Sequence, residues 1–117
     1  MTKKITYSKG ESKIKNFLKK HNIEFEREKQ FDTKVNKQLP FDFYLSDLNI
    51  CIEYNGIQHY EETPYSRNNL RRRQYNDNLR KEYCIKRNIE FIVIPYWDFM
   101  KINNILYNKL IYSNQSI

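Results

Sequence analysis

The segment LPFDFYLSDLNICIEYNGIQHY, residues 39–60, decides the fold that the sequence predicts. Two runs rich in β-branched and aromatic residues, 41–45 and 49–55, flank SDLN, which is a typical turn sequence. We therefore predict a β-hairpin of two antiparallel strands. Gly56 ends it, and we expect residues 57–65 to form a connecting loop.

The turn determines which residues of the two strands face each other. A two-residue turn at residues 47–48 pairs Ser46 with Asn49, and counting back along both strands places Asp42 opposite Glu53. The same register gives the hairpin an apolar face, on which Phe43 lies opposite Ile52 and Leu45 opposite Ile50. The other face carries Asp42, Glu53, Tyr44 and Cys51.

Two carboxylates that face each other need a neutralising partner. Like charges directly across a strand pair destabilise it by up to about 1 kcal/mol. A divalent cation that takes one oxygen from each carboxylate removes this repulsion, and Mg²⁺ typically binds one or two carboxylates together with waters and phosphates. Three alternatives stay open: one carboxylate points to solvent, an arginine bridges the pair, or the register differs by one residue.

Glu11 is a further carboxylate in a costly position. Ser8 can cap a predicted helix at residues 9–21, and Glu11 lies three residues before Ile14 and seven before Leu18, on the side expected to be buried. A carboxylate there is costly unless a cation lies close. The alternative is an acid in the first helical turn that the helix dipole favours.

His59 follows the end of the hairpin by three residues. An imidazole near a metal ion can orient or deprotonate a water, or protonate a leaving oxygen. A surface or structural histidine is the alternative.

Asp77 is an acid in an otherwise basic helix. It lies seven residues from both Leu70 and Cys84, on the same helix line, which predicts an inward and paired position. A simple pairing with Arg73 or Lys81 explains it equally well.

The charge of the chain indicates a polyanionic partner. The 117 residues carry a formal net charge of +7, and the excess is concentrated in residues 1–20, with seven lysines, and residues 67–87, with eight lysines and arginines. AT-rich coding also raises the lysine content, and a membrane surface or a ribosome is an alternative partner. AT-rich coding does not explain the run Arg71-Arg72-Arg73, so we expect nucleic acid.

Length and composition predict one compact domain over residues 1–117, with a core at about 8–112. No apolar stretch is long enough to span a membrane, and the lysine-rich start lacks the apolar run of a secretory signal, so we expect a cytosolic protein. Cys51 and Cys84 have no zinc-site spacing, and we expect reduced, structural thiols.

The remaining elements follow from hydrophobic periodicity. We predict a strand from Ile23, a polar loop at residues 32–38, a helix at 66–87 and a buried strand at 91–95. A last helix begins at the cap Asp98, and its apolar side is formed by Phe99, Ile102, Leu106 and Leu110. The tail from Ser113 is expected to be frayed. Both HNIEF at 21–25 and RNIEF at 87–91 indicate a helix end followed by a strand. The order α-β-β-β-α-β-α describes an α/β fold with a small mixed β-sheet flanked by helices.

Taken together, these residues resemble a known family. Residues 39–60, followed by YNDNLRKEYCIKRNIEFIVIPYW at 75–97, are similar to the very-short-patch-repair-like branch of the PD-(D/E)XK nucleases, especially the phage-borne homing endonucleases with an EDxHD signature. The likeness runs from about Gly10 to Trp97, and its motifs are specific as a set. It implies a restriction-endonuclease-like fold and a metal-dependent DNA endonuclease in the cytoplasm of a bacterial host.

The resemblance also implies roles for particular residues. In signature order, the matching residues are Glu11, Asp42, His59 and Asp77, with Glu53 as the second acid of the broader superfamily and the carbonyl of Tyr54 as a further metal ligand. The metal is usually Mg²⁺, for which Mn²⁺ can substitute, and the histidine is thought to assist the attacking water. The superfamily lysine two residues after the second acid is Asn55 here, which fits the EDxHD branch.

Basic and aromatic residues are predicted to hold the nucleic acid. Phosphates are expected to contact Lys13, Arg71, Arg72 and Arg73, and a splayed base is expected to stack on Tyr60 or Tyr65. A homodimer would let so small a domain cut both strands, with the outer side of the last helix as its first candidate interface; a wide core-facing surface is the alternative. Other functions stay open, namely a non-catalytic nucleic-acid-binding module that kept the fold and a nuclease for structured RNA.

Overall fold

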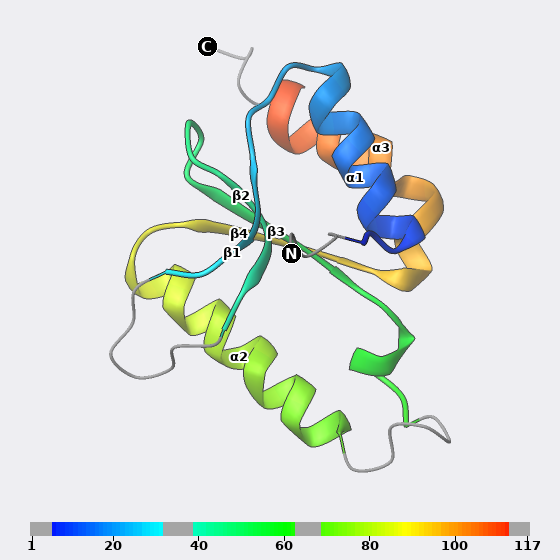
Figure 1. The fold of residues 1–117 in the computed structure, drawn as a ribbon, viewed down its shortest axis with the longest axis vertical. Helices are drawn as coiled ribbons and strands as arrows, with labels where there is room; N and C mark the ends of the chain where they lie inside the picture. Colours follow the sequence, from blue (N-terminus) through cyan, green and yellow to red (C-terminus); the bar gives the residue numbers. More distant parts are fainter. Residues whose placement is uncertain (1–5, 32–38, 63–68, 113–117) are drawn as a thin grey trace, which may run out of the picture.

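The computed structural model describes residues 6–31, 39–62 and 69–112. These residues form a mixed four-stranded sheet with helices on both faces (Figure 1). Its elements are, in order, α1 (Lys9–Lys20), β1 (Glu26–Lys29), β2 (Phe41–Leu45), β3 (Ile50–Asn55), a 3₁₀ turn η1 (Ile57–His59), α2 (Leu70–Lys86), β4 (Glu90–Pro95), a 3₁₀ segment η2 (Tyr96–Lys101), α3 (Ile102–Leu106) and a π-helical end η3 (Tyr107–Tyr112). The predicted fold class and element order are confirmed.

The strands lie in the order β1-β2-β3-β4. β1 and β3 both pair antiparallel with β2, whereas β3 and β4 pair parallel, so the chain crosses over between them through α2. The predicted hairpin register is confirmed, because Phe43 pairs with Ile52 and Leu45 with Ile50. β3 begins one residue later than expected, since Asn49 adopts a positive φ of 56° in the turn.

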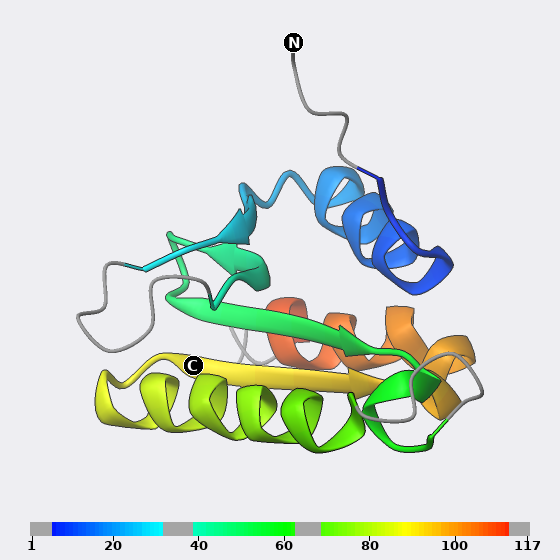
Figure 2. The ribbon, with the colours of Figure 1, turned by 60° about the horizontal axis from the view of Figure 1, so that its bottom comes forward.

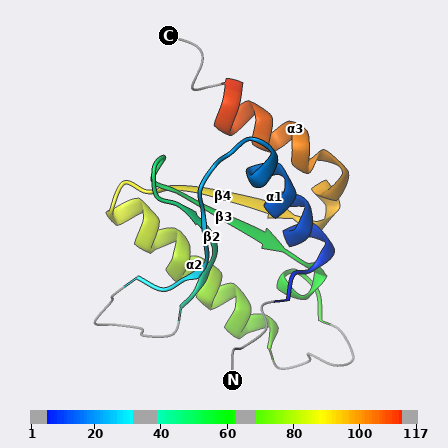
Figure 3. The same cartoon turned by 45° about the horizontal axis from the view of Figure 1, so that its top comes forward.

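The two faces of the sheet carry separate apolar clusters. α1 and α3 lie side by side on one face, and the core beneath them consists of residues such as Ile14, Leu18, Phe43, Ile52, Ile94, Ile102 and Leu106 (Figure 3). α2 covers the other face, over Phe41, Cys51, Cys84 and Ile89 (Figure 2). Both cysteines are buried free thiols.

The predicted start of the first strand is wrong. β1 begins at Glu26, three residues after the predicted start at Ile23. The reason is the end of α1, where Asn22 turns the chain with a φ of 57° and the backbone N–H of Ile23 still donates to the carbonyl of Leu18 at 2.9 Å. Ile23 and Phe25 pack against the core without pairing to β2.

The predicted cap of the last helix is also wrong. The chain enters the 3₁₀ segment η2 directly after Pro95, so Asp98 lies inside this segment, with a φ of −98°, and α3 begins only at Ile102. The apolar stripe is confirmed, because Ile102, Leu106 and Leu110 are buried and Phe99 packs against them.

Some predictions concern residues that the structure does not describe. They are the polar loop at 32–38, residues 63–65 of the connecting loop including Tyr65, the start of the second helix at 66–68 and the tail from Ser113. Within the described residues this helix, α2, runs from Leu70 to Lys86.

The two similar helix ends, at residues 21–25 and 87–91, form the same cap. Asn22 and Asn88 both have a φ of 57°, and the following isoleucine N–H donates to a carbonyl five residues earlier at 2.9 Å in each case. Asparagine is one of the few residues other than glycine that adopts this left-handed conformation at low cost.

We expect Asn88→Ala to lower the free energy of unfolding by about 1 kcal/mol, because alanine adopts the left-handed conformation less readily. Asn88→Gly should be neutral or stabilising. Urea denaturation measures both, and Asn103→Ala, in the right-handed backbone of α3, is the control. Equal effects of the alanine and glycine variants at position 88 would show that the conformation does not matter.

Candidate active site

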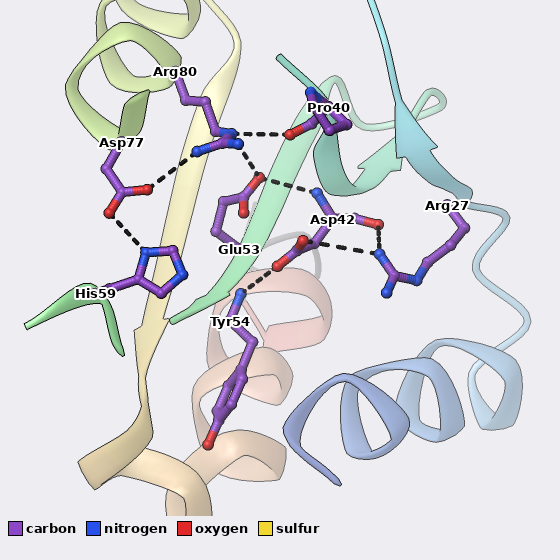
Figure 4. Close-up of polar contacts among 8 residues, drawn as sticks. All are labelled: Arg27, Pro40, Asp42, Glu53, Tyr54, His59, Asp77 and Arg80. Carbon is purple, nitrogen blue, oxygen red and sulfur yellow. Dashed lines mark hydrogen bonds and ion pairs between the residues drawn. The ribbon is translucent and has the colours of Figure 1, made fainter. Parts of the chain in front are cut away.

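Asp42 and Glu53 lie side by side on the hairpin, and each carboxylate is held by the backbone of the opposite strand (Figure 4). The N–H of Asp42 donates to Oε1 of Glu53 at 3.0 Å, and the N–H of Tyr54 donates to Oδ2 of Asp42 at 3.0 Å. The predicted juxtaposition is therefore present, and both side chains line one pocket.

Burial and repulsion make two negative charges costly at this point. Burial raises the pKa of Asp42, to which the charge of Glu11 adds, although the N–H of Tyr54 acts in the opposite direction. Burial raises the pKa of Glu53 well above its ordinary value, and the charge of Asp42 raises it further. The interaction between the two carboxyl groups acts in opposite directions on them, since it raises the pKa of Glu53 and lowers that of Asp42.

Two arginines flank the pair, one beside each carboxylate. Nη2 of Arg27 lies 2.9 Å from Oε2 of Glu11, and its Nη1 donates to the carbonyl of Asp42 at 3.0 Å and lies 3.8 Å from Oδ1. Nε of Arg80 lies 3.9 Å from Oε1 of Glu53 and donates to the carbonyl of Pro40 at 2.9 Å. One alternative from the sequence is a single arginine that bridges the two carboxylates. The structure instead places one guanidinium beside each carboxylate, and neither arginine bridges the pair.

Neither arginine was predicted as a site residue from the sequence, although weak signals for both exist. Arg27 continues the alternation of Ile23 and Phe25 and therefore belongs on the inward side. Arg80 lies three residues after Asp77, a spacing that favours an ion pair on a helix.

Both interpretations of Glu11 hold in the structure. It forms a capping box with Ser8, in which the N–H of Ser8 donates to Glu11 at 2.9 Å and the N–H of Glu11 donates to Oγ of Ser8 at 3.1 Å. It also binds Arg27 and lines the same pocket as the carboxylate pair. The close approach of α1 depends on Gly10, where an added Cβ would clash with the ring of Tyr54.

His59 and Asp77 form a pair at the other side of the pocket. Nδ1 of His59, in η1, lies 2.9 Å from Oδ2 of Asp77, in α2, and the other oxygen of Asp77 accepts from Nη1 of Arg80 at 3.1 Å. The predicted inward and paired position of Asp77 is confirmed, but its partners are His59 and Arg80 and not Arg73 or Lys81.

One pocket of about 290 Å³ collects most of the predicted catalytic residues. Its lining consists of Glu11, Asp42, Glu53, Tyr54, His59, Arg73, Asn76 and Arg80. A larger groove of about 630 Å³ between α2 and the sheet adjoins it and shares Glu53 and His59, with Asp77 also in its wall. The structure therefore brings all five predicted catalytic residues to one place.

The residues predicted to contact nucleic acid lie in different surroundings. Arg71 and Arg72 are exposed, whereas Arg73 lies in the pocket. Lys13 donates to the carbonyl of Phe99 at 3.3 Å and lies over its ring, so part of its hydrogen-bonding capacity is already used.

Tyr60 belongs to an aromatic cluster beside the pocket. Its ring centroid lies 4.7 Å from that of Trp97, which is 60% exposed, and its hydroxyl accepts from Nδ2 of Asn55 at 3.3 Å. The cluster presents aromatic surface near the pocket, as stacking on a base requires.

The donor set suits a magnesium ion better than a transition metal. Among residues 6–31, 39–62 and 69–112, no group of three or more His, Cys, Asp or Glu side chains is arranged to hold a metal ion. Mg²⁺ needs fewer protein ligands, because it binds one or two carboxylates and completes its shell with waters and phosphates. Asp42 and Glu53 fit this pattern, since they line one pocket and repel each other.

None of the helices that the structure describes is both long enough and apolar enough to cross a membrane.

Comparison with known proteins finds a viral relative. No family model and no solved structure matches the chain. The chain is similar to uncharacterized protein 307L of Invertebrate iridescent virus 6, with 38% identity over 78 residues, which are 64% of this chain and 39% of the viral protein. The chain thus spans about two fifths of the length of that relative.

We expect Glu53→Gln to stabilise the metal-free protein, and the gain to grow as the pH rises. The pKa of Glu53 is higher in the folded protein than in the unfolded chain. At a pH between these two pKa values the folded protein therefore binds more protons than the unfolded chain. Stability is thus lost as the pH rises through the folded pKa. Glutamine removes this loss and keeps the oxygen that accepts from the N–H of Asp42.

Urea denaturation in EDTA measures the effect. The two proteins should be nearly equal in stability near the unfolded pKa, and the variant should gain about 1 kcal/mol at alkaline pH. A difference that shrinks with rising pH would contradict the assigned repulsion.

Proposed function

We propose that the chain is a metal-dependent endonuclease domain that hydrolyses phosphodiester bonds of DNA. The observation that supports this most is a single pocket lined by the Asp42–Glu53 carboxylate pair and by His59, whose imidazole is held by Asp77. A carboxylate pair for a divalent cation beside an oriented base is the equipment that phosphodiester hydrolysis needs.

The cation would be Mg²⁺, with Mn²⁺ as a substitute. Asp42 and Glu53, with the carbonyl of Tyr54, would hold it, and the bound ion would stabilise negative charge on the phosphate and lower the pKa of a coordinated water. Its binding would also offset the repulsion that raises the pKa of Glu53 in the metal-free protein.

His59 acts as the general base in this proposal. In the neutral ring, Nδ1–H donates to Asp77, which leaves the lone pair of Nε2 to accept a proton from water. The water oxygen forms a bond to phosphorus, the bond from phosphorus to one sugar oxygen breaks, and that oxygen takes up a proton from solvent. The products are a phosphomonoester and a sugar hydroxyl. Arg80 positions Asp77, and Glu11 positions Arg27.

The net charge of +7 supports a nucleic-acid substrate. The exposed Arg71 and Arg72 are placed to contact phosphates of the backbone without reading sequence, and Tyr60 offers a ring for an unstacked base. A homodimer and a location in a bacterial cytoplasm stay predictions from the sequence.

We expect purified protein to nick plasmid DNA with Mg²⁺ or Mn²⁺ and to be inactive in EDTA. Asp42→Asn should lower the cleavage rate by about 10²–10³-fold, because a neutral amide neither holds the cation nor offsets its charge, while DNA binding in a gel shift changes little. Asp47→Asn, an exposed aspartate in the turn of the same hairpin, is the matched control and should keep full activity.

Two outcomes would overturn the assignment. DNA binding without cleavage under any metal would make the domain a non-catalytic binding module. Faster cleavage of a structured RNA than of DNA, with the same dependence on Asp42, would keep the chemistry and change the substrate.

A further inference from the structure

Arg73 lines the pocket and has no side-chain partner among residues 6–31, 39–62 and 69–112. Of the three arginines at the pocket, Arg27 binds Glu11 and the carbonyl of Asp42, and Arg80 binds Asp77 and the carbonyl of Pro40. Among the described residues, the guanidinium of Arg73 makes no hydrogen bond and no ion pair, and its Nε is buried without a hydrogen-bond partner. Arg73 therefore differs from Arg80, the other arginine that lines the pocket, and from Arg27, which binds Glu11 of its lining.

The position of Arg73 on α2 explains why it reaches the pocket. Arg73, Asp77 and Arg80 are spaced by four and three residues, so they lie along one side of the helix, and Arg73 and Arg80 line the same pocket as the carboxylate pair. Arg71 and Arg72 point in other directions and are exposed, whereas Arg73 is half-buried.

The usual partner of Arg73 is already occupied. Asp77 lies four residues further along the helix, a good distance for an ion pair, but its two oxygens bind His59 at 2.9 Å and Arg80 at 3.1 Å. A half-buried guanidinium that no carboxylate of the described residues contacts is costly. The pocket thus holds a fixed positive charge that a bound anion would neutralise.

A phosphodiester that enters this pocket needs such a charge. Glu11, Asp42 and Glu53 line the pocket and repel a phosphate, and the charges of Arg27 and Arg80 are partly offset by their own partners. A guanidinium can donate two parallel N–H bonds to two oxygens of one phosphate, which an ammonium cannot do.

We propose that Arg73 is a catalytic residue that binds the phosphate undergoing cleavage, while Arg71 and Arg72 contact phosphates outside the site. This inference rests on the proposed function. The guanidinium holds the two non-bridging oxygens of the scissile phosphate and stabilises the charge that grows on them as water adds to phosphorus.

The test compares Arg73→Gln with Arg72→Gln, its neighbour on the same helix. In single-turnover cleavage of plasmid DNA at saturating protein, Arg73→Gln should lower the rate about 10²-fold or more with little loss of DNA affinity. Arg72→Gln should weaken binding and reduce the dependence of affinity on salt, and should lower the rate at saturating protein far less than Arg73→Gln does. Arg73→Lys keeps the charge but not the paired donors, and should have an intermediate rate.

Equal cleavage rates of the Arg73→Gln and Arg72→Gln proteins would overturn the inference and leave the nuclease assignment intact. If Arg73→Gln fails to fold by circular dichroism, Arg73→Lys decides, and a rate equal to that of the wild type would overturn the inference.

A second readout does not depend on cleavage. Inorganic phosphate, compared with chloride at constant ionic strength, should raise the melting temperature of the wild type and of Arg72→Gln more than that of Arg73→Gln. If the wild type cleaves nothing but this difference is found, the phosphate site stands and the nuclease proposal fails. Equal phosphate effects on all three proteins would contradict the site itself.

Discussion

The repulsion between the carboxyl groups of Asp42 and Glu53 is the constraint on which the rest of the site depends. The hairpin holds them side by side, each through an N–H of the opposite strand, and burial removes the water that would otherwise screen them. The surrounding groups respond to this repulsion. One arginine lies beside each carboxylate, and burial together with the charge of Asp42 raises the pKa of Glu53.

The fold supplies the stiffness that such an arrangement requires. The apolar faces of β2 and β3 are packed under α1 and α3, which fixes the opposite, polar side of the hairpin against α2. Gly10 lets the start of α1 approach the ring of Tyr54. The backbone N–H of the same Tyr54 donates to the carboxylate of Asp42. A site built on strands and helix ends in this way keeps its side chains in place better than one built on loops alone.

The sequence was sufficient for the local features and insufficient for the long-range ones. The hairpin register could be predicted because the side-chain period of a strand is two and the turn fixes its start, which brought Asp42 and Glu53 together. Arg27 and Arg80 were missed because their contacts with Glu11, Pro40 and Glu53 join distant parts of the chain, and the local signals, strand alternation and the spacing to Asp77, do not reveal these contacts. Asp98 failed as a cap because Pro95 already starts a tighter helix.

The most direct test of the account is the location of a bound metal ion. Crystals grown with Mn²⁺ should show an anomalous scattering peak in contact with carboxylate oxygens of both Asp42 and Glu53, and the peak should disappear in the double variant Asp42→Asn, Glu53→Gln. A peak elsewhere in the molecule, or an empty carboxylate pair at saturating Mn²⁺, would contradict it.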